Sequence, residues 1–309
     1  MLANDKAFSP VMGGTDTMYD MDDDQFTLWQ ALLKQRIGMM MPYERKSFLV
    51  TNLGIRMREI GCSDYQEYYD LLHSGRSGSV EWSLLVDRLT VHETRFFRHK
   101  SSLSFISKYF LPEWVERAAE PYTVNVWSVG CATGEEPYTL AIVIDQYMKE
   151  KNIESYMGII ASDISLTSIA VGRRGVYHER KLREMDSEAR DTYMTRVGEK
   201  QYQVNKDMRQ RICFTYMNVL EIGKAPVGKM DLIYCQNLLI YFDQERRNKI
   251  INGLTEHLLP GGIIVLGSGE VLGWQHPELE KIPYEKILAY RRKSVNDNEA
   301  NQSVQGLRA

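Results

Sequence analysis

The stretch from Thr123 to Pro137 reads TVNVWSVGCATGEEP, and it decides the fold. Its first seven residues are mostly apolar or β-branched, which predicts a buried strand. Gly130 and Gly134 then allow a sharp turn before a helix begins. A strand, a glycine turn and a helix in this order bring the backbone close to a ligand at the carboxyl end of a parallel sheet. The alternative is a turn with a structural role alone.

The sequence beyond this motif alternates runs of strand length with longer helical stretches. This alternation predicts an α/β fold, in which helices cover both faces of a parallel sheet. We expect the last run, residues 286–291, to pair antiparallel at the edge. The expected strands are residues 123–129, 157–162, 212–217, 230–235 and 262–266, and the main helices are residues 137–149 and 243–259.

Three acidic residues narrow the ligand of this sheet. Asp163 follows the second expected strand, where a carboxylate can hold the hydroxyls of a ribose; the alternative is a helix cap. Glu135 and Glu136 open the helix after the glycine turn, and two carboxylates disfavour a pyrophosphate there. They suit a cationic ligand such as S-adenosylmethionine (SAM). The motif therefore favours a methyltransferase over a nicotinamide-dependent dehydrogenase.

The first 90 residues follow a different pattern, with apolar side chains at helical spacing. Helices are expected over residues 26–37, 42–60, 63–73 and 80–91. The sequence thus predicts a helical domain over residues 21–90, a linker over 91–120 and an α/β domain over 121–293. Residues 176–211 are an expected β insertion in that domain. Residues 1–20 and 294–309 are polar and are expected to be disordered.

Composition excludes several classes of protein. The chain has 309 residues, and its 38 basic and 41 acidic side chains leave a net charge of −3, which argues against a nucleic-acid-coating protein. No apolar run approaches the ~20 residues that span a bilayer, and the first residues do not resemble a signal peptide. The four cysteines form no CxxC motif and the six histidines no HExxH motif. We therefore expect a reduced cytoplasmic protein without a metal site.

Several further blocks match one known family in order and spacing. They are TRFFR from Thr94, WSVGCATGEEPY from Trp127, ASDI from Ala161, NVL from Asn218, DLIYCQNLLIYF from Asp231 and LPGG from Leu259. On these blocks, residues 25–292 resemble the CheR-type chemoreceptor glutamate O-methyltransferases. The resemblance implies a class I SAM-dependent methyltransferase with a Rossmann-like, seven-stranded sheet. It also implies a small all-helical N-terminal domain and a small antiparallel β insertion.

The resemblance also implies a reaction and a set of SAM contacts. SAM is the co-substrate, glutamate side chains of methyl-accepting chemotaxis receptors are methylated, and the products are the methyl ester and S-adenosylhomocysteine. Glu135 is expected to meet the methionine ammonium, Asp163 the ribose, and Asn218 and Val219 the adenine. His92 stands where the family usually has Asn, and Gln236 where it has Arg. The full implied set is His92, Thr94, Arg98, Glu135, Asp163, Asn218, Val219, Gln236 and Asn237.

Methylation of a carboxylate needs no strong base, because a glutamate with a pKa of about 4.3 is already ionised at neutral pH. What the protein must supply is alignment. Arg98 is the best candidate to orient the carboxylate, since a guanidinium binds it bidentately; the alternative is an ordinary salt bridge. Tyr241 is a candidate hydrogen-bond donor at the same place, and the alternative is core packing. Both are predicted catalytic residues.

The partner implied by the resemblance is the cytoplasmic domain of a chemoreceptor, whose helices are rich in glutamate. Arg45 and Arg56 share a face of the second expected helix, and Lys46 and Arg58 flank it. These four are the predicted docking residues, with solvated charges as the alternative. A second basic cluster lies at residues 173–183. The turn at residues 197–200 is short, so we do not expect binding of a C-terminal receptor tether. A non-catalytic SAM-binding regulator of a chemosensory or surface-motility pathway is the alternative function.

Overall fold

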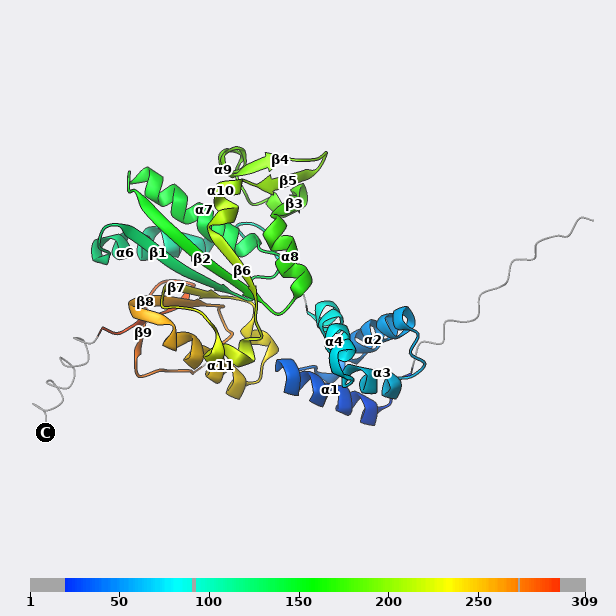
Figure 1. Ribbon diagram of the computed structural model, residues 1–309. Helices are drawn as coiled ribbons and strands as arrows, with labels where there is room; N and C mark the ends of the chain where they lie inside the picture. Colours follow the sequence, from blue (N-terminus) through cyan, green and yellow to red (C-terminus); the bar gives the residue numbers. More distant parts are fainter. Residues whose placement is uncertain (1–19, 91–92, 272, 295–309) are drawn as a thin grey trace, which may run out of the picture. The chain divides into compact units, whose positions relative to one another are not determined.

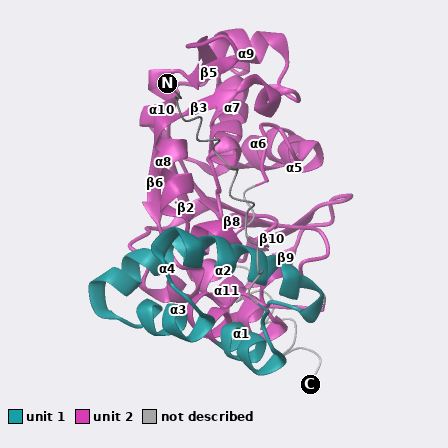
Figure 2. Cartoon of the chain, turned by 90° about the vertical axis from the view of Figure 1, so that its right-hand side faces the viewer, with its two compact units in different colours: residues 1–31, 41–85 teal, residues 32–40, 86–309 magenta. Residues whose placement is uncertain are grey.

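The computed structural model describes residues 20–90, 93–271 and 273–294, and it divides into two compact units. Unit 1 comprises residues 1–31 and 41–85, and unit 2 comprises residues 32–40 and 86–309 (Figure 2). The boundary therefore differs from a cut near residue 90, because the end of the first helix and the end of the fourth helix are counted with unit 2. The expectations for residues 1–20 and 294–309 fall almost entirely outside the described residues.

Unit 1 is helical, as the sequence predicts. Its helices are α1 (Asp23–Ile37), the 3-10 turn η1 (Tyr43–Arg45), α2 (Lys46–Ile60), α3 (Tyr65–Leu72) and α4 (Gly75–Leu89). The Asp64 side chain caps α3 by accepting hydrogen bonds from the backbone of Gln66 and Glu67. Helix α4 begins earlier than expected, at a glycine- and serine-rich segment. A Cβ atom at Gly78 would lie 2.4 Å from the Leu71 carbonyl oxygen, so glycine there allows close packing against the end of α3.

Unit 2 contains the expected sheet. Its seven strands lie in the order β6-β2-β1-β7-β8-β10-β9 (Figure 1). Neighbours from β6 to β8 are parallel, whereas β10 pairs antiparallel with β8 and β9 antiparallel with β10. The bounds are β1 (Tyr122–Val129), β2 (Ser155–Asp163), β6 (Ile212–Tyr216), β7 (Met230–Cys235), β8 (Leu258–Leu266), β9 (Leu279–Lys281) and β10 (Leu288–Arg292). The prediction of an antiparallel final strand is confirmed, but β9 is the edge strand and was not expected.

Successive side chains of a strand point to opposite faces, and this alternation builds two cores. Val124 and Val126 of β1 belong to one apolar cluster, together with side chains of α7 (Glu135–Glu150). Trp127 and Val129 belong to the other cluster, together with side chains of α11 (Gln244–Glu256). The sheet therefore has a helical layer on each face, which is the predicted doubly covered architecture.

The segment expected as a linker contributes to the first of these cores. It forms α5 (Lys100–Phe105), the π-helical turn η2 (Ile106–Phe110) and α6 (Leu111–Arg117). Phe105, Phe110 and Trp114 are buried in the cluster that contains β1 and α7. The spacing of these apolar residues fits a helix with one buried face. The prediction of a linker did not take this helical pattern into account.

The expected β insertion lies between α8 (Leu166–Arg174) and β6. A three-stranded antiparallel sheet forms there in the order β3-β5-β4 (Figure 1). The hairpin predicted around the turn at residues 197–200 is confirmed. The elements are β3 (Val176–His178), η3 (Glu179–Leu182), α9 (Ser187–Tyr193), β4 (Met194–Arg196), β5 (Gln201–Val204) and α10 (Lys206–Gln210).

The order of the strands fixes where a ligand binds. From β1 the chain moves outward to β2 and β6, then returns to β7 on the other side of β1. Open α/β sheets bind ligands at the carboxyl ends of the strands on either side of such a reversal. The segments that follow β1, β2 and β7 therefore define the candidate site.

Candidate active site

A small, mostly apolar cavity of about 100 Å³ lies at this reversal, and we call it the first cavity. Residues after β1, β2, β6 and β7 form most of its lining. Ile37 and Met39, from the end of α1 and the segment after it, also line it. Gly38 between them has a φ of +72°, and a Cβ atom there would meet the Phe242 ring at 2.8 Å. Glycine thus allows the segment after α1, which is counted with unit 2, to pack closely against Phe242 of the same unit, a contribution that helical periodicity did not reveal.

Asp163 ends β2 and lines the first cavity. Its two carboxylate oxygens accept hydrogen bonds from the backbone of Ala132, at 2.8 Å, and of Ser165, at 2.9 Å. A carboxylate has about four lone-pair positions, so it can still accept hydrogen bonds from a ribose. The bond to Ala132 also ties the glycine turn after β1 to the end of β2. The position is the one expected for Asp163.

Asn218 and Val219 also line the first cavity. The Asn218 side chain is engaged within the protein: Nδ2 donates to the Arg36 carbonyl at 2.8 Å, and Oδ1 accepts from the Leu220 backbone at 3.1 Å. It thereby caps η4 (Val219–Lys224) and holds the end of α1 in place. Val219 supplies apolar surface, so these two residues shape the cavity.

A second cavity, of about 60 Å³, lies next to the first and has a charged lining. The two share Gly130, Ala132 and Asn237. Thr94, Arg98 and Glu136 are among the polar residues of the second cavity. An apolar cavity and a charged cavity joined at one glycine turn fit a ligand with an aromatic base at one end and an amino acid at the other.

The two glutamates that open α7 have different surroundings. Glu135 is fully buried, and its carboxylate lies 3.1 Å from Lys181 Nζ and accepts from the Thr133 hydroxyl at 2.7 Å. Among the described residues, the lining of neither cavity includes Glu135. Glu136 lines the second cavity, and the Ser128 hydroxyl donates to it at 2.7 Å. Burial raises the Glu136 pKa to about 8, opposed by the Ser128 bond and by Arg98.

Arg98 lies between the second cavity and a wider opening. One Nη1 hydrogen bond, 2.7 Å long, goes to the Glu93 carbonyl. The wider opening, of about 550 Å³, shares Arg98, His99, Gln236 and Asn237 with the second cavity, and we call it the outer groove. Arg98 is therefore reached from both sides.

Comparison with known proteins agrees with this geometry. Residues 92–287 match the family model "CheR methyltransferase, SAM binding domain", and residues 24–90 match "CheR methyltransferase, all-alpha domain". The chain belongs to the CheR methyltransferase family. It is a SAM-dependent methyltransferase, and most of the residues that line the first two cavities lie in its SAM-binding domain.

Curated CheR relatives cover most of this chain. The chemotaxis protein methyltransferase of Borreliella burgdorferi is 26% identical over 252 residues, which is 81% of this chain and 88% of the relative. Chemotaxis protein methyltransferase 1 of Pseudomonas aeruginosa is 27% identical over a match that covers 87% of this chain and 97% of the relative. Chemotaxis protein methyltransferase 2 of Vibrio cholerae is 29% identical over a match that covers 80% of this chain and 85% of the relative.

The CheR motif TRFFR is anchored by the β insertion. Thr94 lines the second cavity, and its carbonyl accepts a 2.6 Å hydrogen bond from Lys181 Nζ. The Phe96 backbone N–H donates to the Lys181 carbonyl at 3.1 Å. Since Lys181 also pairs with Glu135, one lysine links the TRFFR motif, the insertion and the start of α7. This basic residue of the second cluster therefore has an internal role.

Gln236 is buried, and its side-chain amide is occupied. Nε2 donates to Ser102 Oγ at 2.9 Å and to the Leu266 carbonyl at 3.3 Å, and Oε1 accepts from the Tyr234 hydroxyl at 2.8 Å. A glutamine here connects β7, β8 and α5 around the second cavity. His92, the other departure from the usual CheR pattern, lies outside the described residues.

The structure separates the two predicted catalytic residues. Tyr241 lines the first cavity, whereas Arg98 lines the second cavity and the outer groove. The Tyr241 carbonyl accepts from the Met40 backbone at 2.8 Å, which fixes η5 (Leu239–Tyr241) against the segment after α1. The side chains of Tyr241 and Arg98 therefore line different cavities.

The predicted docking residues of unit 1 differ in accessibility. Arg56 is a correction: its side chain is only 12% exposed, and it forms ion pairs with Glu81 and Glu59, so it is not available as a docking surface. Lys46 is half-buried and pairs with Asp23 at 2.7 Å. Arg45 is half-buried and stacks on the Phe48 ring at 4.5 Å, and Arg58 is exposed. The helical face predicted from spacing is therefore only partly a basic surface.

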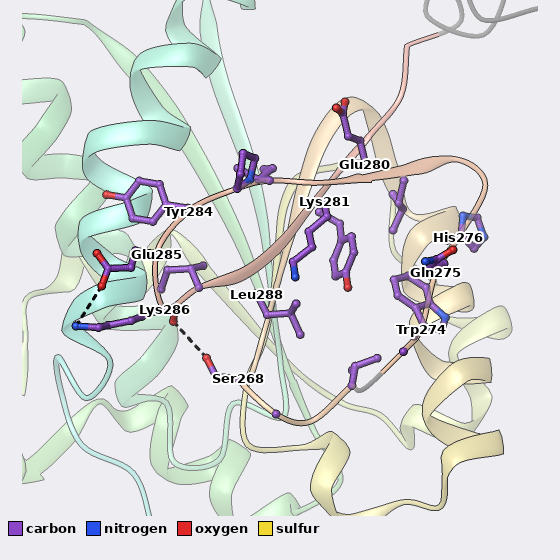
Figure 3. A pocket seen from close by; sticks show the side chains of 18 of the residues that line it. Ser268, Trp274, Gln275, His276, Glu280, Lys281, Tyr284, Glu285, Lys286 and Leu288 are labelled. Carbon is purple, nitrogen blue, oxygen red and sulfur yellow. Dashed lines mark hydrogen bonds and ion pairs between the residues drawn. The ribbon is translucent and has the colours of Figure 1, made fainter.

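A wider cavity shares none of its described lining residues with the first two cavities. It is an open groove of about 1600 Å³ lined by residues between Ser268 and Lys293, and Figure 3 shows Trp274, His276 and Tyr284 around it. It shares only Ser268, Lys286 and Ile287 with the outer groove.

The residues that the structure describes bear on two further questions, membrane crossing and metal binding. No helix in this part of the chain is long and apolar enough to cross a membrane. Within the same ranges, no three His, Cys, Asp or Glu side chains come together as metal ligands would.

Proposed function

We propose that this protein transfers the methyl group of SAM to glutamate side-chain carboxylates of a chemotaxis receptor. The products are glutamate methyl esters and S-adenosylhomocysteine. Its curated relatives carry the name chemotaxis protein methyltransferase, and its CheR domains cover the all-helical and SAM-binding parts. The acceptor glutamate and the receptor are inferred from the chemistry of the site and from the family resemblance.

The observation that carries the proposal is the position of Arg98. Its guanidinium lies between the second cavity and the outer groove, and it has one hydrogen bond to the Glu93 carbonyl. A guanidinium has five N–H donors, so it can still bind a carboxylate bidentately. A substrate glutamate that enters through the outer groove would meet Arg98 at the boundary of the SAM cavity.

The reaction needs alignment more than proton transfer. The substrate carboxylate is ionised at neutral pH, so one of its oxygens attacks the methyl carbon directly. The new O–C bond forms as the C–S bond breaks, and the electron pair of that bond makes the sulfonium a neutral thioether. No proton is removed, so the site needs no general base. Arg98 holds the attacking group, and Glu136 is the candidate partner of the methionine ammonium.

SAM is held across the two joined cavities in this proposal. Asp163 accepts hydrogen bonds from the ribose, Val219 contacts the adenine, and Thr94 and Asn237 line the methionine end. Arg45 and Arg58 of unit 1 contribute positive charge that attracts a glutamate-rich receptor helix. The proposed partner is the receptor's cytoplasmic domain, which places the protein in the cytoplasm.

The test uses purified protein, SAM with a tritiated methyl group, and membranes that contain a chemoreceptor. The proposal expects label in the receptor that mild base releases as volatile methanol, because methyl esters hydrolyse under conditions that leave N-methyl groups intact. Membranes without receptor are the control. SAM binding without transfer to any receptor would contradict the proposal and favour a non-catalytic SAM-binding regulator.

A further inference from the structure

Residues 176–182 of the β insertion contact two of the segments that line the second cavity. These residues comprise β3 and η3, and we call them the insertion arm. One of the two segments is TRFFR, which supplies Thr94 and Arg98 to the lining. The other is the glycine turn after β1, which supplies Gly130 and Ala132. The two segments are distant in sequence, so tertiary contacts hold them at the separation that the cavity requires.

The TRFFR segment is bound by Lys181 of the insertion arm at two points. Lys181 Nζ donates a 2.6 Å hydrogen bond to the Thr94 carbonyl, and the Lys181 carbonyl accepts from the Phe96 backbone at 3.1 Å. The next residue, Phe97, has a φ of +54°, which a bulky side chain adopts only when its surroundings hold it there. Arg98 follows directly, so the arm holds the backbone that sets the direction of Arg98.

The glycine turn is bound by Tyr177 of the same arm. The Tyr177 side chain is buried, and its hydroxyl donates to the Thr133 carbonyl at 2.7 Å. Gly134 has a φ of +95°, and a Cβ atom there would lie 2.9 Å from the Tyr177 hydroxyl oxygen, so this close approach requires glycine. The Tyr177 ring also packs edge-to-face on Phe96, with ring centroids 5.0 Å apart. Tyr177 therefore contacts both segments.

The ammonium of Lys181 joins the two segments a second time. Lys181 Nζ lies 3.1 Å from one carboxylate oxygen of Glu135, and the other oxygen accepts from the Thr133 hydroxyl at 2.7 Å. The Glu135 side chain is 0% exposed, whereas that of Lys181 is 27% exposed. A buried carboxylate is unfavourable unless a partner compensates for the loss of water. The same ammonium thus holds the Thr94 carbonyl and neutralises the start of α7.

We infer that Lys181 is a positioning residue for SAM binding: it holds the TRFFR segment against the glycine turn, and Tyr177 supports it. Among the residues that the structure describes, the linings of the first two cavities do not include Lys181, so it acts through Thr94 and the start of α7. The β insertion is therefore part of the framework of the SAM site. This inference rests on the proposed place of SAM across the two joined cavities, and it does not depend on the methyl acceptor.

Lys181→Met tests the inference by isothermal titration of SAM against the full-length protein, well below the unfolding temperature of the variant. Methionine keeps an unbranched apolar stem but lacks the ammonium, so the Thr94 carbonyl loses its donor. The SAM Kd is expected to rise about tenfold, the size of effect for loss of a hydrogen bond from a charged group. A purely structural role would lower the number of binding sites per protein and leave the Kd of the folded molecules unchanged. A wild-type Kd, with or without fewer sites, would overturn the inference.

The matched control is Lys200→Met, the same chemical change at an exposed position of the same insertion. It is expected to leave the SAM Kd unchanged, because Lys200 lies beyond the insertion arm. An equal rise of the Kd in Lys200→Met would refute the positioning role, since the loss of positive charge on the insertion would then explain both results.

If Lys181→Met does not fold, Tyr177→Phe replaces it. Phenylalanine keeps the ring that packs on Phe96 and removes only the donor to the Thr133 carbonyl, so the Kd is expected to rise about fivefold. Tyr202→Phe, at the position of β5 that pairs with Tyr177, is its control and is expected to bind SAM normally. A wild-type Kd for Tyr177→Phe, or the same rise in Tyr202→Phe, counts against the inference.

The outcomes also separate this inference from the proposed function. Unmodified protein that binds SAM but labels no receptor counts against the proposed function alone. Lys181→Met protein that binds SAM with the wild-type Kd counts against the positioning role alone, whether or not receptor is labelled.

Discussion

Arg56 in unit 1 and Arg98 in unit 2 were both assigned to function from the sequence, and the structure gives them opposite surroundings. Arg56 is 12% exposed, and its guanidinium is bound by the carboxylates of Glu81 and Glu59. Arg98 has one hydrogen bond to a backbone carbonyl and opens on two cavities. The comparison shows that an arginine is available for a ligand only when the fold has not already supplied its carboxylates.

The largest expected effect is on Arg98. Arg98→Ala should lower kcat for methyl transfer by about 100-fold or more, the range for loss of one pre-organised group at a reacting centre. Thermal unfolding should stay close to wild type, because within the described residues the hydrogen bond that is lost goes to the exposed Glu93 carbonyl region of the backbone and not to a buried carboxylate. Arg98→Lys keeps the charge but not the bidentate fork and should be intermediate. Wild-type turnover in Arg98→Ala would show that another group orients the carboxylate.

The opposite result is expected for Arg56. Arg56→Ala removes the partner of Glu81, a residue only 7% exposed that also accepts a 2.7 Å hydrogen bond from the Tyr68 hydroxyl. Leaving such a carboxylate unpaired should lower the free energy of unfolding by about 3 kcal/mol, measured by urea denaturation. Arg58→Ala on the same helix is the control and should change it by less than about 0.5 kcal/mol. An Arg56→Ala variant of full stability that methylates receptor poorly would restore the docking role.

The neighbouring glutamates extend the comparison to pH. Burial raises the Glu136 pKa to about 8, which favours the protonated form of this carboxyl group near neutral pH. A ligand ammonium favours the ionised form, so SAM binding should release that proton and the SAM Kd should fall as the pH rises toward 8. Glu136→Gln should lose this part of the pH dependence. The titration of SAM itself affects the wild type and Glu136→Gln equally. The difference between the two proteins in the pH dependence of the SAM Kd therefore reports on Glu136 alone.

Glu135→Gln is the matched control for this experiment, because Glu135 pairs with Lys181 and lies outside the cavity linings of the described residues. It should keep the wild-type pH dependence of SAM binding, while its thermal stability falls. If Glu135→Gln rather than Glu136→Gln removes the pH dependence, the original assignment of Glu135 to the ammonium is correct.

The smallest expected effect is at the accessible basic residues of unit 1. Arg45→Glu and Arg58→Glu should each raise the KM for receptor about threefold, since charges at the rim of an interface act mainly on encounter. The SAM Kd should not change. The effect should also shrink at high salt. Equal changes in the SAM Kd and the receptor KM would argue against a docking surface on this helix.

The TRFFR motif shows why the site could be predicted only in part. Thr94 and Arg98 can be recognised as candidates from their immediate neighbours in the sequence, and both residues line the second cavity in the structure. The same sequence gives no indication that Lys181, far along the chain, holds the Thr94 carbonyl and Glu135. The contact of His99 with Asn237 was missed for the same reason, because the two residues are distant in sequence.

The sequence by itself determined the α/β class, the glycine turn, the acid after β2, the helical N-terminal part and the CheR motifs. These features are local, because strand alternation, helical periodicity and turn chemistry act over a few residues. Only the tertiary structure decided which of two adjacent glutamates lines a cavity, which arginine is already paired, and that Lys181 holds both Thr94 and Glu135. Those outcomes depend on burial and on partners brought together by the order of the strands, and the spacing of residues along the chain does not encode them.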